Sequence, residues 1–208
     1  KLQKDVIEAE VEVIRLMGAE FRYGVEVGRD VTLDELRAQG FKAFYVAIGC
    51  QGGRLAGIPG EDAEDVTVAV DFLREVNSGK IDALPGRTIV VGGGNVAIDV
   101  ARNACRLGSE HVEMFCLESE AQMPASEEER REAIEDGAHI SCGWGPKEVH
   151  LDEAGRVCGI TFKRCMRVFD DEGRFAPEYD ENDLRRVDAD RVVMSIGQSI
   201  VWGDLLAG

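Results

Sequence analysis

Apolar residues recur along this chain with two periods, one typical of helices and one typical of strands. In residues 4–16 they recur every three to four positions, which predicts an amphipathic helix. Residues 19–23 and 42–48 predict strands, the second of them buried. Between them, Asp30 or Thr32 is placed to cap a short helix. The first part of the chain therefore predicts the order helix, strand, helix, strand.

Glycine and proline are concentrated in residues 50–62, where they indicate turns and not regular elements. We place the first domain boundary in this segment. Residues 66–76 then predict an amphipathic helix that ends near Gly79. Pro85 and Gly86 follow and introduce the next strand.

The middle of the chain alternates predicted strands with predicted helices. Residues 88–91 and 112–117 predict strands, and residues 95–107 predict the helix between them. A polar helix follows over residues 126–136, with Ser126 as its cap. This alternation predicts a parallel sheet.

From residue 138 onward, short predicted strands are joined by turns rich in aspartate and glycine. Their spacing is typical of antiparallel hairpins, and they cover residues 147–151, 157–166 and 186–189. Residues 191–196 then return as a buried strand. The chain therefore predicts an α/β fold, with a parallel sheet, helices on both of its faces and an added antiparallel β-hairpin layer.

Residues 92–97 read Gly-Gly-Gly-Asn-Val-Ala and lie between a predicted strand and a predicted helix. Each small residue of this G-x-G-x-x-A pattern has a mechanical role. Gly92 permits a tight turn, Gly94 lets a pyrophosphate approach the backbone at the helix start, and Ala97 allows close packing of helix on strand. The pattern predicts a Rossmann-like sheet that binds the pyrophosphate of a nicotinamide dinucleotide.

The end of the second strand of such a unit distinguishes NADH from NADPH. An acidic residue there binds the ribose 2′-hydroxyl, whereas arginine binds a 2′-phosphate. Here the sequence is Cys116-Leu117-Glu118-Ser119, and the Glu118 carboxylate would repel a phosphate. We therefore expect NAD(H) to be favoured over NADP(H). The alternative is that Glu118 is a solvated surface residue without a binding role.

The chain carries 40 Asp and Glu against 24 Lys and Arg, a formal net charge of −16. This balance leaves no basic surface for a phosphate backbone, so we expect no nucleic-acid partner. No apolar run approaches the length of a membrane span. We therefore expect no membrane contact and a cytoplasmic location.

Cysteines are scattered through the chain without a Cys-x-x-Cys pair or a cysteine–histidine cluster at zinc spacing. The pattern signals neither a redox disulfide nor a metal site, and we expect buried, inert thiols. The six residues are Cys50, Cys105, Cys116, Cys142, Cys158 and Cys165.

Several segments together resemble the small (beta) subunit of glutamate synthase and its relatives among the FAD-dependent pyridine nucleotide-disulfide oxidoreductases. The resemblance extends over nearly the whole chain. The matching segments include Lys4-Asp5-Val6, Ala47-Ile48-Gly49, Ile58-Pro59-Gly60-Glu61, residues 91–99, Met123-Pro124-Ala125, Gly143-Trp144-Gly145-Pro146-Lys147, Tyr179-Asp180-Glu181-Asn182-Asp183 and Ser195-Ile196-Gly197-Gln198.

In that family two FAD-binding segments enclose an inserted nicotinamide-binding domain. The resemblance implies that residues 1–62 are a partial FAD-binding segment, residues 63–190 the NAD(P)H-binding domain, and residues 191–208 a return strand into the FAD domain. The flavin domain's own glycine turn and its later Gly-Asp are missing. We therefore expect an excised fragment, inactive alone because half a flavin site cannot retain FAD.

The family passes hydride from the nicotinamide to the flavin, and electrons then pass through iron–sulfur clusters to a partner subunit. The resemblance implies that the intact protein carries FAD and iron–sulfur clusters, the clusters lying outside this fragment. It implies two kinds of partner, namely the missing parts of its own FAD domain and a redox subunit such as the glutamate synthase large subunit. One departure is that many relatives have Tyr-Arg-Arg where this chain has Cys116-Leu117-Glu118.

No side chain need act as acid, base or nucleophile, because hydride transfer between stacked rings is carried by the cofactors. We expect residues 195–198 to approach the nicotinamide and residues 47–49 to line the junction with the flavin domain. The predicted cofactor-binding residues are Gly92, Gly93, Gly94, Asn95, Val96, Ala97, Cys116, Leu117, Glu118, Ser195, Ile196, Gly197, Gln198, Ala47, Ile48 and Gly49. None is predicted to be catalytic or to bind a metal.

Two other functions stay open on the sequence. The chain could be a nucleotide-sensing or subunit-docking module that binds NAD(H) without transferring hydride. It could also have a dinucleotide-type fold that binds nothing. Flavin-binding motifs in the flanking sequence would favour the enzyme over the sensor.

Overall fold

The computed structural model describes residues 3–206 and divides the chain into two compact units. The first unit comprises the residues up to Ile48 together with those from Val201 onward, and the second unit is Gly49–Ile200. These divisions differ from the sequence-based boundaries at residues 62 and 190. The assignment of the flanking segments to a flavin domain stays a prediction.

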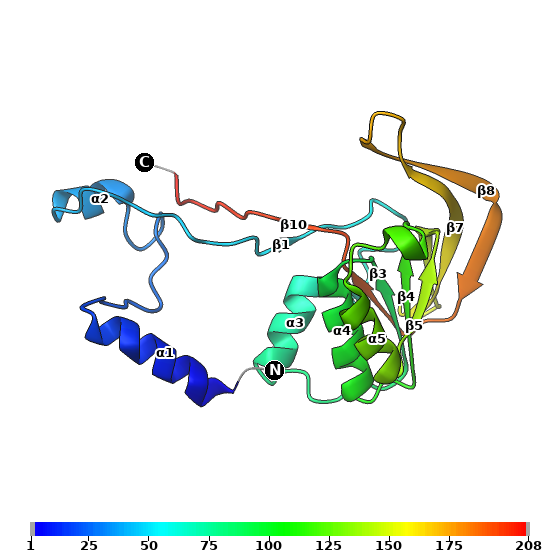
Figure 1. Cartoon of the computed structure of the whole chain (residues 1–208), viewed down its shortest axis with the longest axis horizontal. Coiled ribbons are helices and arrows are strands. Elements are labelled where there is room, and N and C mark those ends of the chain that lie inside the picture. Colours follow the sequence, from blue (N-terminus) through cyan, green and yellow to red (C-terminus); the bar gives the residue numbers. More distant parts are fainter. Residues whose placement is uncertain (1–2, 207–208) are drawn as a thin grey trace. The chain divides into compact units, whose positions relative to one another are not determined.

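The first unit contains α1 (Lys4–Leu16) and α2 (Leu33–Ala38), which confirm the two predicted helices (Figure 1). Thr32 caps α2, because its hydroxyl accepts a hydrogen bond from Glu35 N at 3.1 Å. The Glu35 carboxylate in turn accepts one from Thr32 N at 2.8 Å, which completes a capping box. The alternative cap, Asp30, instead accepts a hydrogen bond from a backbone N–H of the preceding loop.

The strands predicted over residues 19–23 and 42–48 are absent from the described part of the first unit, so this prediction is wrong. Both segments are irregular, and Tyr45 is 94% exposed. A strand is stable only when its backbone groups bond to a neighbouring strand. None of the sheets found in residues 3–206 supplies that neighbour.

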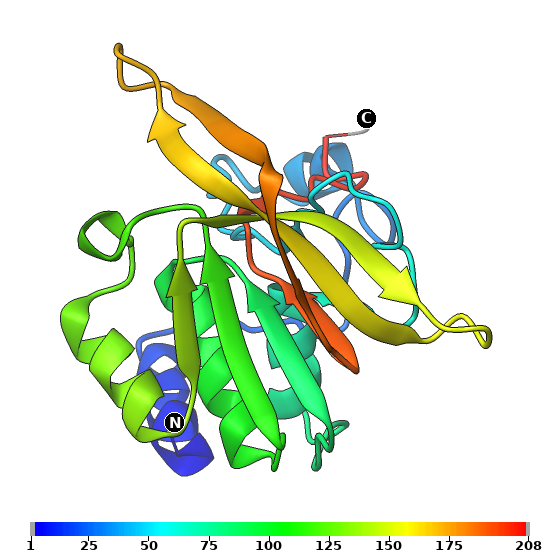
Figure 2. The same ribbon diagram turned by 90° about the vertical axis from the view of Figure 1, so that its right-hand side faces the viewer.

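The second unit is built on a five-stranded parallel sheet with the order β2-β9-β3-β4-β5 (Figure 2). The pairings align Val91 with both Phe115 and Met194. The carboxyl ends of β3, β4 and β9 therefore lie together at one edge of the sheet. The strands are β2 (Val66–Val68), β3 (Arg87–Val91), β4 (His111–Cys116), β5 (His139–Cys142) and β9 (Arg191–Met194).

The two faces of this sheet are covered by different layers (Figure 1). Helices pack on one face, and an antiparallel sheet packs on the other. Successive residues of a strand point to opposite faces, so alternate residues contact the two layers. Val90 belongs to the helix-side core, whereas Ile89 and Val91 belong to the core under the antiparallel sheet. The helices are α3 (Ala69–Asn77), α4 (Asn95–Arg106) and α5 (Glu127–Glu135), and the antiparallel strands are β6 (Trp144–Leu151), β7 (Val157–Phe169) and β8 (Phe175–Val187).

The predicted α/β fold class is confirmed, with its parallel sheet and its antiparallel layer. The prediction of helices on both faces is wrong, because the antiparallel layer occupies the second face. The prediction of a helix from residue 66 is also corrected, since Val66 and Val68 extend the sheet beside β9 and α3 begins only at Ala69. β5 was not predicted, and β8 is longer than the expected residues 186–189.

The strand β9 lies between β2 and β3 and hydrogen-bonds to both. It therefore belongs to the sheet of the second unit, whereas the sequence assigned residues from 191 onward to the flavin domain. Val192 and Val193 are fully buried there, each in the core of one face. After β9, the short antiparallel pair β1 (Gly52–Gly53) and β10 (Gln198–Ser199) holds the loop that follows β1 beside the segment that follows β9.

Candidate functional site

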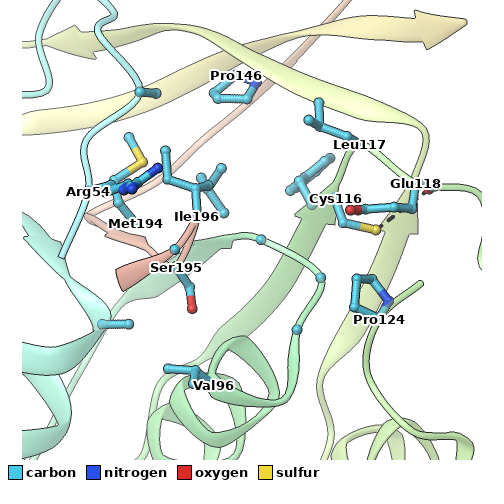
Figure 3. A pocket seen from close by; sticks show the side chains of 18 of the residues that line it. Arg54, Val96, Cys116, Leu117, Glu118, Pro124, Pro146, Met194, Ser195 and Ile196 are labelled. Atoms are coloured by element: carbon cyan, nitrogen blue, oxygen red, sulfur yellow. Dashed lines mark hydrogen bonds between the residues drawn. The ribbon is translucent and has the colours of Figure 1, made fainter. Parts of the chain in front are cut away.

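A cleft of about 640 Å³ opens at the carboxyl ends of β3, β4 and β9 (Figure 3). Ligands of open parallel α/β sheets bind at this edge. The second unit supplies all of its lining. The lining residues are Gly53, Arg54, Leu55, Ala56, Ala69, Val70, Val91, Gly92, Gly93, Gly94, Asn95, Val96, Phe115, Cys116, Leu117, Glu118, Pro124, Trp144, Pro146, Phe175, Pro177, Tyr179, Met194, Ser195, Ile196, Gly197 and Gln198.

The glycine turn forms the floor of this cleft, and two of its glycines are required by close packing. Gly92 has φ +139°, and a Cβ there would lie 2.2 Å from Ser195 O. A Cβ on Gly93 would lie 2.8 Å from Cys116 Cβ. A side chain larger than hydrogen would therefore push the turn away from β4 or β9.

Gly94 leaves the start of α4 open toward the cleft. It is the N-cap of the helix with extended backbone, makes no side-chain cap, and has open space where a Cβ would be. The first backbone N–H groups of a helix have no partner within the helix, and the helix dipole favours an anion beside them. This end of α4 is therefore suited to a phosphate group.

Asn95, Val96 and Ala97 follow the glycines with different surroundings. Asn95 and Val96 line the cleft, and the Asn95 side-chain oxygen accepts a hydrogen bond from Ser126 N at 3.2 Å. Ala97 is absent from the lining and is fully buried in the helix-side core. Its small side chain therefore serves the packing of α4 on the sheet.

The segment after β4 lies beside the turn. Glu118 Oε2 is 3.1 Å from the position that a Cβ on Gly93 would take, and Glu118 O accepts a hydrogen bond from Gly143 N at 2.9 Å. The Cys116 thiol is buried, and burial, followed by the neighbouring Cys142, raises the pKa of Cys116. Cys116 is therefore a neutral thiol in the wall of the cleft.

The segment after β9 forms the opposite wall. Ser195 N donates a hydrogen bond to Val91 O at 2.7 Å, which holds this segment beside the glycine turn. Ser195 Oγ is buried and, among the described residues, is one of the few buried side-chain polar atoms without a hydrogen-bond partner. Such an atom is costly unless a ligand or water satisfies it.

The cleft contains one cationic residue that the sequence did not signal. Arg54 lies on the loop after β1, and its Cδ is 3.6 Å from the position that a Cβ on Gly197 would take. Within the lining, Arg54 and Glu118 are the only charged residues, and they lie at opposite ends of the cleft (Figure 3). The pairing of β1 with β10 brings Arg54 there, and no local motif predicts that pairing.

The antiparallel layer adds an apolar wall that was likewise not predicted. Trp144 and Pro146 come from β6, and Phe175, Pro177 and Tyr179 come from one face of β8. Burial is the main cause that raises the pKa of Tyr179. These side chains make one side of the cleft apolar.

Three predicted residues lie elsewhere. Ala47 and Ile48 belong to the first unit, Gly49 begins the second, and none of the three lines the cleft. Their proposed position at a flavin junction stays a prediction.

The ionisable side chains of the lining are Arg54, Cys116, Glu118 and Tyr179. No histidine lines the cleft. Residues 3–206 contain no group of three or more His, Cys, Asp or Glu side chains that could hold a metal ion. None of the helices within these residues has the length and apolar character of a membrane span.

A model of the family described as pyridine nucleotide-disulphide oxidoreductase matches residues 3–201. The chain is 32% identical to the glutamate synthase (NADPH) small chain of Escherichia coli, with 95% of this chain and 44% of that protein covered. It is 31% identical to the NAD-dependent dihydropyrimidine dehydrogenase subunit PreT of the same organism, with 95% and 43% covered. The chain thus spans less than half the length of these relatives.

Among solved structures, a mutant of FprA from Mycobacterium tuberculosis has the same fold. The TM-score is 0.75 at 20% sequence identity, and the match covers 94% of this chain and 59% of FprA.

Proposed function

The chain belongs to the pyridine nucleotide-disulphide oxidoreductase family, and we propose that its second unit binds the nicotinamide dinucleotide of a flavin-dependent oxidoreductase. The glycine turn carries this proposal, because three glycines and the uncapped start of α4 line a cleft of about 640 Å³. A pyrophosphate there would accept hydrogen bonds from backbone N–H groups and be favoured by the helix dipole.

The two walls of the cleft are suited to the two halves of the dinucleotide. At the β4 end, the Glu118 carboxylate is an acceptor for ribose hydroxyls. At the β9 end, Ser195 Oγ is a buried hydroxyl without a hydrogen-bond partner among residues 3–206, suited to the ribose or carboxamide of the nicotinamide half. Residues 195–198 and 116–118 keep, in this proposal, the binding roles expected from the sequence.

We propose that NADH is favoured over NADPH. Glu118 lies beside the glycine turn, and the only cation of the cleft lining, Arg54, lies at the other end. A 2′-phosphate on the adenosine ribose would therefore be repelled by the Glu118 carboxylate, and no cation of the cleft lining would neutralise it there. Relatives named for NADPH and for NAD both exist, so the family alone does not decide the nucleotide.

When bound, the nicotinamide supplies a hydride, and the FAD of the intact protein would receive it. The residues of this chain bind the nucleotide, orient it and exclude water, and none has to move a proton. The first unit and residues 47–49 would belong to the flavin-binding domain. From there electrons would pass through iron–sulfur clusters to a redox partner such as a glutamate synthase large subunit, an arrangement supported by relatives that are named as a small chain and a subunit.

A titration with NADH and with NADPH tests the proposal. Trp144 lines the cleft, so quenching of its fluorescence reports binding, and Trp202→Phe removes the tryptophan of the first unit. We expect tighter binding of NADH, and Glu118→Ala should weaken NADH binding. Glu110→Ala removes a carboxylate at the opposite end of β4 and should leave binding unchanged. A chain that binds neither nucleotide contradicts the proposal, and tighter binding of NADPH contradicts the role of Glu118.

The same titration does not separate an enzyme from a nucleotide sensor. A chain extended by its flanking segments and loaded with FAD would separate them. Bleaching of the flavin absorbance by NADH is expected of the oxidoreductase and not of the sensor.

A further inference from the structure

Two cysteines that are distant in the sequence lie side by side at the edge of the cleft. Cys116 ends β4, Cys142 ends β5, and their Sγ atoms are 3.6 Å apart. The two residues are direct partners in the parallel ladder. Both contact the helix-side core, so their side chains lie on the same face of the sheet.

This arrangement fits the geometry of a disulfide. Neighbouring strands are about 4.8 Å apart, which falls within the Cα separation of roughly 4.4–6.8 Å that disulfides span. The S–S bond is about 2.05 Å long, so the sulfur atoms have to approach by roughly 1.5 Å.

Cys142 is placed to make that movement. β5 is the edge strand of the sheet, so hydrogen bonds to a neighbouring strand hold it on one side only. Gly143, with φ +79°, follows directly. Cys142 is partly exposed and lines a second cavity of about 290 Å³, whereas Cys116 lines the nucleotide cleft. The two thiols therefore lie between the nucleotide cleft and the second cavity.

We propose that Cys116 and Cys142 form a reversible disulfide, and that this modification weakens nucleotide binding at the cleft. The first part rests on the geometry of the two thiols alone. The second part rests on the function proposed above.

The oxidant is hydrogen peroxide, which is small enough to enter the second cavity of about 290 Å³. With hydrogen peroxide, the Cys142 thiolate attacks one oxygen, the O–O bond breaks, and a sulfenic acid forms while the other oxygen leaves as water after protonation. Cys116 sulfur then attacks Cys142 sulfur, the S–O bond breaks, and the oxygen leaves as a second water. The two thiols lose two protons and two electrons, and the peroxide is reduced to two waters.

The surroundings favour this order of events. Burial raises the pKa of the Cys116 thiol, so Cys116 is the weaker first nucleophile. Cys142 is the more exposed of the two thiols. Cys116 therefore acts as the resolving residue.

The disulfide would alter the cleft through Cys116. Its Sγ is 3.4 Å from the position that a Cβ on Gly93 would take, and 3.7 Å from Glu118 O. Moving this sulfur toward Cys142 shifts the segment that carries the Glu118 carboxylate and abuts the glycine turn. We expect the affinity for NADH to fall about tenfold, the usual size of a coupling between two sites.

The first test measures the modification on the whole chain. After treatment with hydrogen peroxide, the intact mass should fall by two hydrogen atoms, and proteolysis should release a peptide pair joined through Cys116 and Cys142 that dithiothreitol separates. Cys158→Ser should behave like the unaltered chain, and Cys142→Ser should form no such pair. In Cys116→Ser, oxidation should stop at a sulfenic acid on Cys142 that dimedone labels. A pair joining Cys142 to Cys165, or no pair, overturns the proposal.

The second test measures NADH affinity before and after oxidation by the fluorescence of Trp144. The affinity should fall on oxidation and recover on reduction, and Cys142→Ser should show neither change. If the oxidised chain binds NADH with unchanged affinity, the proposed effect of the disulfide on binding is wrong, while the proposed disulfide itself still stands. If the reduced chain binds neither nucleotide, the proposed function and the coupling fail together, while the mass measurement still decides whether the disulfide forms.

Discussion

The two units of the chain bury very different shares of their apolar side chains. Among the described residues of the first unit none is buried, and Val13 and Phe41 are 55% and 50% exposed. In the second unit Phe72, Phe115 and Phe162 are at most 1% exposed. Both units form capped helices, but within residues 3–206 all the named strands belong to the second unit. A helix can therefore form from one local segment, whereas a strand depends on the segments that pair with it.

The largest expected contrast between the units concerns Gly92 and Gly40, whose φ angles are +139° and +102°. A Cβ at Gly92 would lie 2.2 Å from Ser195 O, whereas nothing lies within 4 Å of a Cβ at Gly40. Gly92→Ala should abolish NADH binding and lower the unfolding temperature of the second unit. Gly40→Ala should cost about 1–2 kcal/mol locally and leave NADH binding unchanged. Calorimetric titration and thermal unfolding measure both, and retained binding in Gly92→Ala would show that the turn can shift without loss.

The next contrast concerns two aromatic residues, Phe162 and Tyr45. The ring of Phe162 stacks on Phe115 with centroids 3.9 Å apart in the core of the second unit, whereas Tyr45 is 94% exposed. Phe162→Ala should lower the free energy of unfolding by about 3–5 kcal/mol. Tyr45→Ala should change it by less than about 0.5 kcal/mol. Denaturant unfolding followed by the fluorescence of Trp144 in the second unit and of Trp202 in the first gives both values. Similar losses would contradict the proposed difference between the units.

A smaller effect is expected at the cationic end of the cleft. Arg54→Ala should weaken NADH binding about tenfold, which corresponds to one hydrogen bond to a charged group. Arg37→Ala removes an exposed arginine of the first unit, ion-paired with Asp34, and should leave NADH binding unchanged. Equal affinities of the two variants would place Arg54 outside the set of binding residues.

The smallest effect is a dependence of stability on pH. Asp136 accepts hydrogen bonds from Arg102 and Arg106 of α4, each at 2.8 Å, and the bond from Arg102 is the main cause that lowers the pKa of Asp136. Because the folded pKa lies below the unfolded value of about 3.9, the stabilisation is present above that pH and is lost as the pH falls through the folded pKa. Asp136→Asn should therefore flatten the acid decline of the unfolding temperature.

Asp30 provides the matched control in the first unit. Its pKa is also lowered, mainly by a hydrogen bond from a backbone N–H. Asp30→Asn should leave the acid unfolding of the second unit unchanged, because Asp30 belongs to the other unit. A flattened profile in this variant would show that the two units unfold together.

Much of the cleft could be predicted because its central motif is contained in one short segment. A strand, three glycines and a helix start specify the turn within residues 87–98, and the structure forms it there. The predicted segments after β4 and β9 also lie in the cleft, since the carboxyl ends of parallel strands share one edge. Arg54, Trp144 and Tyr179 were missed because sheet pairing brings them there from distant parts of the chain.

The approximate positions of the helices and the glycine turn follow from local sequence, because each depends on hydrogen bonds and steric limits within a few residues. The cap of α2 was narrowed only to Asp30 or Thr32, and the structure shows that it is Thr32. Long-range packing, in contrast, sets which predicted strands form, which layer covers each face of the sheet, and which side chains meet. The cysteine spacing signalled no redox pair, yet the pairing of β4 with β5 places Cys116 and Cys142 sulfurs 3.6 Å apart. Contacts of this kind depend on strand order and register, which long-range packing sets and a local pattern does not contain.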